Sequence, residues 1–293
     1  MDILLTLPIA SYFLSSAPTS WSTSLNIFFF YITWSTLVLS HSALKIEIIG
    51  TTALRIALWL APSLFFLAFD TLLPSLAKTI KHNGASALPP RSAKTLAKLV
   101  GLALLNLGLE TALEAAISHG LATVLKTPLF RTSTTLPPAR QMATHLGLLL
   151  AARELLTYAI HRHLLHGHPL PAPFPRTVTR LAALHTTHAH RARAPAPSLA
   201  AKTDHPLPHL LHRFAPLYLP AAALSLALPA RLHLLTYLLF AGAVALEETL
   251  TLSGYAVVPG VVMGGVARRT AAHYATRGRG CFGTWGLLDW LLG

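Results

Sequence analysis

Long apolar stretches dominate the chain and predict helices. The two clearest lie at 24–42 and 52–74, and each comes close to the roughly 20 residues that cross a bilayer as a helix. Four further stretches, each with a few polar residues, lie at about 100–119, 141–165, 210–229 and 232–252. Strands are much shorter, roughly 4–8 residues, so these lengths exclude a string of strands. We therefore expect an all-α, polytopic membrane bundle with four to six crossings.

Polar connectors separate the apolar stretches. Residues 76–98 and 120–140 carry Gly, Pro and charged positions that end one helix before the next begins. Residues 167–208 hold eight prolines around a short helical piece at roughly 177–191, so most of this segment is predicted to be a fixed loop. We divide the chain into N-terminal transmembrane helices with their loops, 1–140, and a histidine-rich region, 141–293.

Composition and charge support a membrane protein. Hydrophobic residues make up 53% of the chain and charged residues 11%, where soluble proteins have roughly 25% charged residues. The net charge of +13 comes from Lys and Arg between the apolar stretches, in 76–98, 161–213 and 268–279. By the positive-inside rule these three segments share the cytoplasmic side, and they do not predict a nucleic-acid partner. The N-terminus lacks a basic region and a cleavage site, so we expect the first stretch to stay as an anchor.

Histidines supply the main chemical signal. Ten of the 16 histidines lie within 161–212, directly after the fourth predicted span. Imidazoles placed at helix ends bind first-row metals well, and the single cysteine, Cys281, offers no thiolate cluster. The sequence therefore predicts a metal site built from nitrogen and oxygen ligands. The candidate ligands from this cluster are His161, His166, His185, His188 and His205.

Spacing along a helix refines these candidates. His185 and His188 are three residues apart and share a face, whereas His161 and His166 are five apart and meet at one site only if the helix unwinds before Gly167. Glu154 and Tyr158 share a stripe with His161 and are predicted to support it from outside the ligand shell. The isolated histidines are expected to be ordinary polar residues, and four others remain open as ligands: His163, His168, His209 and His212.

The order of these signals resembles the fatty acid hydroxylase and sterol desaturase family. YAIHRHLLH, ending at His166, looks like the first histidine box, and LHTTHAH, ending at His190, looks like the second. DHP, with Asp204 and His205, and AAHY, with His273, are similar to later elements, as are SGYAVVPG and GRGCFGTWGLLDW near the C-terminus. Three positions depart from the family pattern, because Ala189, Leu252 and Tyr274 stand where the family has histidine.

The resemblance implies a function and a ligand set. Members of the family are membrane oxygenases that hydroxylate or desaturate lipid chains at the endoplasmic reticulum, with O2 and electrons from a reduced carrier such as cytochrome b5. It implies two iron ions, with zinc an alternative in a purified sample, on the cytosolic face. The full set of predicted ligands is His161, His166, His185, His188, His190, His205 and His273, with Glu248 as a further candidate and Glu154, Tyr158 and Asp204 behind them.

Two other functions remain open from the sequence. The three departures from the family pattern also fit a catalytically inactive, lipid-binding or scaffold protein of the same fold. Carboxylates inside spans together with a histidine-rich loop also fit a metal-ion transporter, which would hold its ligands near the middle of the bilayer. Glu110 and Glu114, one helical turn apart in the third span, are expected to pack inside the bundle or lie at its interface.

Overall fold

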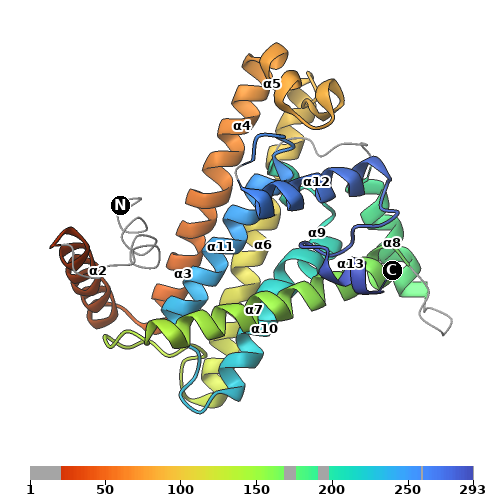
Figure 1. Ribbon diagram of the computed structural model, residues 1–293. Helices are drawn as coiled ribbons and strands as arrows, with labels where there is room; N and C mark the ends of the chain where they lie inside the picture. Colours follow the sequence, from red (N-terminus) through yellow and green to blue (C-terminus); the bar gives the residue numbers. More distant parts are fainter. Residues whose placement is uncertain (1–20, 168–175, 191–197, 259, 293) are drawn as a thin grey trace.

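The computed structural model describes residues 21–167, 176–190, 198–258 and 260–292, and Figure 1 shows it as a bundle of helices. Within these residues every regular element is a helix and no strand occurs, which confirms the all-α prediction. His168 lies outside the described residues.

Four continuous helical segments are long and apolar enough to cross a membrane. They are Ala43–Leu72, Ala93–Leu125, Pro206–Ala227 and Leu234–Leu252, which confirms a multi-pass membrane protein. The first joins α3 (Ala43–Arg55), the π-helix η1 (Ile56–Leu60) and α4 (Ala61–Leu72), and the second is α6 (Ala93–Leu125). The third joins α9 (Pro206–His209), the π-helix η5 (Leu210–Phe214) and α10 (Ala215–Ala227), and the fourth is α11 (Leu234–Leu252).

The two longest helices extend beyond the apolar layer of a membrane. The first segment has 30 residues and α6 has 33. At about 1.5 Å per residue they measure about 45–50 Å, compared with about 30 Å for the hydrocarbon core of a bilayer. The ends of both helices therefore extend past the hydrocarbon core into the polar region beside the membrane.

The predicted span at 141–165 is a helix but does not belong to these four segments. It forms α7 (Ala139–Ala159) and the π-helix η3 (Ile160–Leu165). Arg153, Glu154 and His161 are buried in it, so its polar residues face protein and leave too few apolar positions for a span. In Figure 1, α7 runs across α3, α11 and α6 instead of beside them. The N-terminal stretch forms α2 (Trp21–Ser40), whose described apolar part is the shorter Ile27–Ser40.

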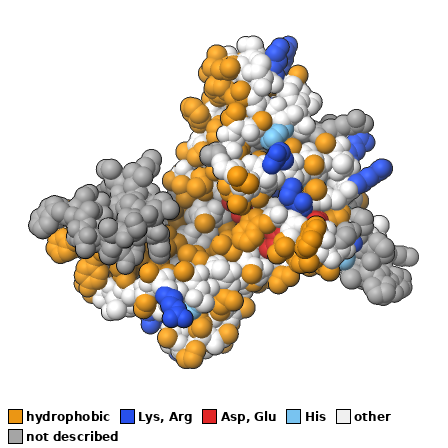
Figure 2. Space-filling model, viewed as in Figure 1, with side chains coloured by type: hydrophobic (Ala, Val, Ile, Leu, Met, Phe, Trp, Pro, Cys, Tyr) orange, Lys and Arg blue, Asp and Glu red, His pale blue; other side chains and the backbone are white. Residues whose placement is uncertain are grey.

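Helix α11 lies at the centre of the bundle. In its most apolar window 67% of the residues are buried, compared with 22% in each of the two long helical segments. Helix α3 of the first segment contacts both α11 and α6. Large apolar side chains such as Phe28, Phe65 and Leu105 remain exposed and suit a lipid surface. Figure 2 shows apolar side chains covering much of the visible face, with Lys and Arg gathered mainly at its upper and right-hand parts.

Buried ion pairs tie the bundle together. Arg55 lies 2.6 Å from Glu114, and Lys202 lies 2.6 Å from Glu110, with all four side chains almost fully enclosed. Glu110 and Glu114 thus pack inside the bundle, as expected. Such pairs are expensive to break, since the remaining charge has no water around it.

Short helices gather at one end of α7. They are α8 (Arg176–His188), the 3-10 helix η4 (Ser198–Lys202), α12 (Val261–Ala275) and α13 (Leu287–Leu292). The helical piece predicted at 177–191 corresponds to α8. The segment predicted as the polar loop 76–98 contains α5 (Pro74–Ile80), the 3-10 helix η2 (Gly84–Ala87) and the start of α6. The cap of short helices surrounds the histidines.

Candidate metal centre

A π-helix brings His161 and His166 together. In η3 the amide N–H of His166 donates to the carbonyl of His161, 3.0 Å away, which is the i to i+5 bond of a π-helix. Residues five apart then stand almost one turn apart, and the two Nε2 atoms lie 3.2 Å from each other. The helix widens instead of unwinding before Gly167, and the sequence could not show which of the two occurs.

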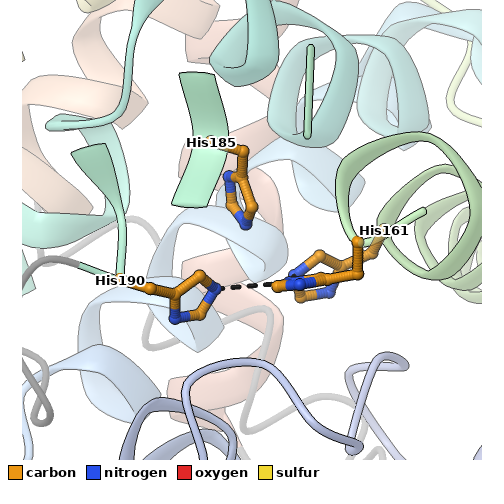
Figure 3. A group of neighbouring side chains, drawn as sticks. His161, His185 and His190 are labelled. Carbon is orange, nitrogen blue, oxygen red and sulfur yellow. Dashed lines mark hydrogen bonds between the residues drawn. The ribbon is translucent and has the colours of Figure 1, made fainter. Parts of the chain in front are cut away.

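The end of α8 supplies two more histidines. His185 lies in the last turn of α8, and His190 follows the end of the helix by two residues. The Nε2 atom of His190 lies 3.2 Å from that of His166. In Figure 3 the rings of His185 and His190 point toward the ring of His161, which comes from a different segment of the chain.

These four histidines form a group that can hold a metal ion. One ring nitrogen from each of His161, His166, His185 and His190 lies within 4.8 Å of the other three. Bonds of about 2.1 Å at angles of 90–109° place ligand nitrogens about 3.0–3.4 Å apart, which matches the two separations of 3.2 Å. The Nε2 of His185 and the Nδ1 of His190 are buried and have no hydrogen-bond partner. The donor set therefore fits a first-row metal.

His212 and His273 lie at the edge of this group. The His212 ring, from η5, is 4.2 Å from the His161 ring between centroids, and the His273 ring, from α12, is 4.6 Å from it. The Nδ1 of His273 contacts the carbonyl of Gly280 at 2.6 Å, and its Nε2 is buried without a partner. Six imidazoles from four segments of the chain thus converge.

Contacts behind the rings orient them. The Nδ1 of His185 lies 2.6 Å from a carboxylate oxygen of Asp204, and the Nδ1 of His161 lies 2.9 Å from the carbonyl of Phe282. A proton on each Nδ1 leaves Nε2 with a lone pair directed at the centre, which is the usual arrangement of metal-binding histidines. Asn106 on α6 fixes the segment that carries Asp204, because its amide donates to the carbonyls of Lys202 and Asp204.

Glu154 and Tyr158 lie outside this ligand group. The carboxylate of Glu154 accepts bonds from the backbone amides of Thr284, Trp285 and Gly286. It therefore holds the loop whose Phe282 carbonyl orients His161, an indirect form of the support predicted for it. The hydroxyl of Tyr158 accepts a bond from Arg162 and has no recorded bond to His161.

His188 and His205 lie together, apart from the four-histidine group. Their ring centroids are 5.4 Å apart, and His188 is exposed with its Nδ1 2.9 Å from the carbonyl of Leu184. The Nδ1 of His205 caps α9 by accepting from the amide of Leu207. Of the residues left open, His209 pairs with Glu110 at 2.8 Å, and His163 is half-buried on η3.

A cavity of about 60 Å³ is lined by carboxylates, by Arg213 and by His161, His185, His190, His209, His212 and His273. Glu248 lies 3.3 Å from Arg213 and 3.7 Å from Arg153, and Glu247 lies 2.8 Å from Arg153. Glu248, the further ligand candidate, is therefore already ion-paired. Ala189, Leu252 and Tyr274 line the same cavity.

Burial favours the neutral form of His190 and His273. Loss of water on burial lowers the pKa of His190 from 6.5 to about 3, with the neighbouring His273 and His185 adding to the effect. Burial likewise lowers the pKa of His273 to about 4, against the opposing bond to Gly280. Neutral imidazole is the form that binds metal.

Several contributors to the site carried no signal in the sequence. The carbonyls of Phe282 and Gly280 orient two rings through backbone atoms, which any residue could supply. Arg213 lines the cavity and Arg153 pairs with two of its glutamates, but in the sequence both stand as single charges in apolar surroundings. His212 stands outside the histidine boxes, and its place in the cluster at 161–212 left it open as a ligand.

The fold and the site together define a polytopic α-helical membrane protein with a histidine cluster suited to metal binding at one end of its helices. The family model for fatty acid hydroxylase matches residues 146–293, half of the chain, and this region contains all six converging histidines. The chain belongs to the fatty acid hydroxylase family. No solved structure matches it.

Proposed function

We propose that the protein is a membrane-bound, non-haem iron oxygenase that hydroxylates or desaturates a lipid, such as a sterol, a fatty acyl chain or a sphingoid-like chain. The single observation that carries this proposal is the convergence of six imidazoles beside the ends of apolar helices; three of these imidazoles, those of His185, His190 and His273, have a buried ring nitrogen without a hydrogen-bond partner. Membership of the fatty acid hydroxylase family supports an oxidoreductase of this kind.

The proposed reaction balances with oxygen and an external reductant. In hydroxylation, a C–H bond and O2 are converted to C–OH and water, and two electrons and two protons come from the reductant and solvent. In desaturation, two C–H bonds and O2 give C=C and two waters with the same electrons and protons. The bound metal would supply the activation of O2, which side chains alone do not provide.

Residues of the chain orient the metal ligands and cover the cavity. Asp204 and the Phe282 carbonyl keep the His185 and His161 rings aimed at the centre. The loop held by Glu154 covers the cavity on one side, because Phe282, Gly283 and Thr284 form part of its lining. Excluding water there protects a reactive centre from side reactions.

The position in the cell is part of the proposal. The basic segments between the helices support a cytosolic histidine cluster, and the family supports the endoplasmic reticulum and a cytochrome b5-type electron donor. The four grouped histidines lie outside the four candidate spans, which argues against a transporter with its ligands at the middle of the bilayer.

Product analysis tests the proposal. Membranes from cells that express the wild-type chain should contain a hydroxylated or desaturated lipid that is absent with a His161→Ala variant of equal abundance. His188→Ala is the matched control, since His188 lies outside the grouped histidines, and it should keep the product. Iron should co-purify with the wild-type protein. A folded, iron-loaded protein that changes no lipid would reject the oxygenase.

A second candidate function is a catalytically inactive protein of the same fold that binds lipid or acts as a scaffold. It is favoured by Ala189, Leu252 and Tyr274, which place three residues without imidazole in the wall of the cavity itself. This candidate predicts that the cellular effect of the protein survives His161→Ala, whereas the oxygenase predicts that it is lost.

A further inference from the structure

The cavity provides ligands for one metal ion but not for two. His161, His166, His185 and His190 form the one group within the described residues whose ligand atoms lie close enough to share an ion. His212 and His273 lie at the edge of this group, and His209, which also lines the cavity, is paired with Glu110 at 2.8 Å. Catalytic metal sites typically have at least three protein ligands, so a second ion would need a carboxylate or a further histidine.

The carboxylates of the cavity are already engaged. Asp204 is paired with His185 at 2.6 Å. Glu247 accepts from Arg153 at 2.8 Å and from the indole N–H of Trp285 at 3.1 Å. Glu248 lies within 3.7 Å of Arg153 and 3.3 Å of Arg213. Binding a second ion would break at least one of these buried pairs.

Two guanidinium groups pair with the glutamates that a second ion would need as ligands. Arg153 is 4% exposed, and Arg213 lines the cavity together with His212 and His273. Two arginines and two glutamates leave this part of the cavity neutral. A divalent ion placed there would be repelled by both guanidinium groups at any dielectric constant, and it would gain no free carboxylate in return.

The three departures from the family pattern meet at the same cavity. Ala189 stands between the end of α8 and His190, Leu252 ends α11 four residues after Glu248, and Tyr274 follows His273 on α12. All three line the cavity, although they lie on three separate segments. Because all three changes remove an imidazole from the same cavity, they indicate the loss of one set of metal ligands.

We propose that the protein binds one metal ion, through His161, His166, His185 and His190, and that the ion pairs of Arg153 and Arg213 with Glu247 and Glu248 occupy the place of a second. This inference rests on the proposed function only in assuming that the centre binds metal. It replaces the two ions that the family resemblance implies, and it makes Glu248 a partner of arginine and not a ligand.

Metal stoichiometry tests the inference. The full-length wild-type protein, purified in detergent after growth with iron, should hold one ion per chain by elemental analysis against amino-acid quantification. Oxidised protein should show the paramagnetic resonance of an isolated ferric ion, whereas a coupled pair of ferric ions would be silent. Two ions and a silent spectrum would overturn the inference and leave the oxygenase intact. A folded protein without metal would overturn both.

Restoring the missing imidazoles provides the converse test. The variant Ala189→His, Leu252→His, Tyr274→His and Arg213→Gln should rise to two ions per chain, and Arg213→Gln alone, the matched control, should stay at one. A folded fourfold variant that stays at one would overturn the assignment of the second place to these residues. Should the fourfold variant not fold, the wild-type stoichiometry and spectrum decide the question.

Discussion

Replacement of Asp204 by alanine should weaken metal binding without removing a ligand. The Asp204 carboxylate lies 2.6 Å from the Nδ1 of His185, is 7% exposed, and also accepts from the backbone amide of His205 at 2.7 Å. Loss of such a partner typically lowers metal affinity by about 10–100-fold. Because this contact is short and buried, we expect the upper part of that range, which corresponds to about 2–3 kcal/mol.

A competition titration against a chromophoric chelator measures this effect. Asp204→Asn keeps one acceptor oxygen and should fall between wild type and Asp204→Ala. His188→Ala is the matched control, since His188 is exposed and lies outside the four-histidine group, and it should bind as the wild type does. The reasoning would be refuted by an Asp204→Ala protein that is folded and binds within twofold of wild type, or by an equal loss in His188→Ala.

Three further predictions concern packing, stability and pH. A Cβ at Gly278 would overlap the His166 ring, so Gly278→Ala should lower metal affinity more than tenfold in the same titration, whereas Gly260→Ala, at a similar φ of +82° with open space around it, should not. Glu114→Ala leaves the Tyr237 hydroxyl without its partner and Arg55 with only its 3.7 Å contact to Glu110, so it should destabilise the protein by about 3 kcal/mol, seen as a lower Tm in detergent; an unchanged Tm would contradict this. His190 and His273 have folded pKa values of about 3 and 4, below the usual 6.5, so the unfolded state binds more protons below pH 6.5. Denaturation of the metal-free protein should therefore show stability that is full above pH 6.5 and falls as the pH drops from 6.5 toward 4, and a flat profile there would count against buried, neutral imidazoles.

Most of the spans could be predicted from the sequence because length and hydropathy are direct consequences of the lipid solvent. The predicted spans at 52–74, 100–119, 210–229 and 232–252 each overlap one of the four apolar helices. The segment 141–165 was wrong as a span, since hydropathy does not show which way a polar side chain points. Arg153 and Glu154 turn inward, and the helix that carries them runs across the bundle.

The candidate site was predictable only in part. Of the six converging rings, His161, His166 and His185 were predicted as ligands from the histidine cluster, His190 and His273 were implied by the family resemblance, and His212 was left open. Spacing on an ideal α-helix placed His185 and His188 on one face, yet α8 ends at His188 and the following turn brings His190 inward instead. The π-helix that unites His161 with His166 has no signature in the residues themselves.

The most direct test of the central claim is X-ray absorption spectroscopy at the metal edge of the purified, iron-loaded protein. Ligation by His161, His166, His185 and His190 predicts a shell of nitrogen or oxygen atoms at about 2.0–2.2 Å, with the multiple scattering of about four imidazoles that falls to about three in His166→Ala. A shell without imidazole scattering, or a spectrum that His166→Ala leaves unchanged, would contradict the claim that these four histidines hold one metal ion.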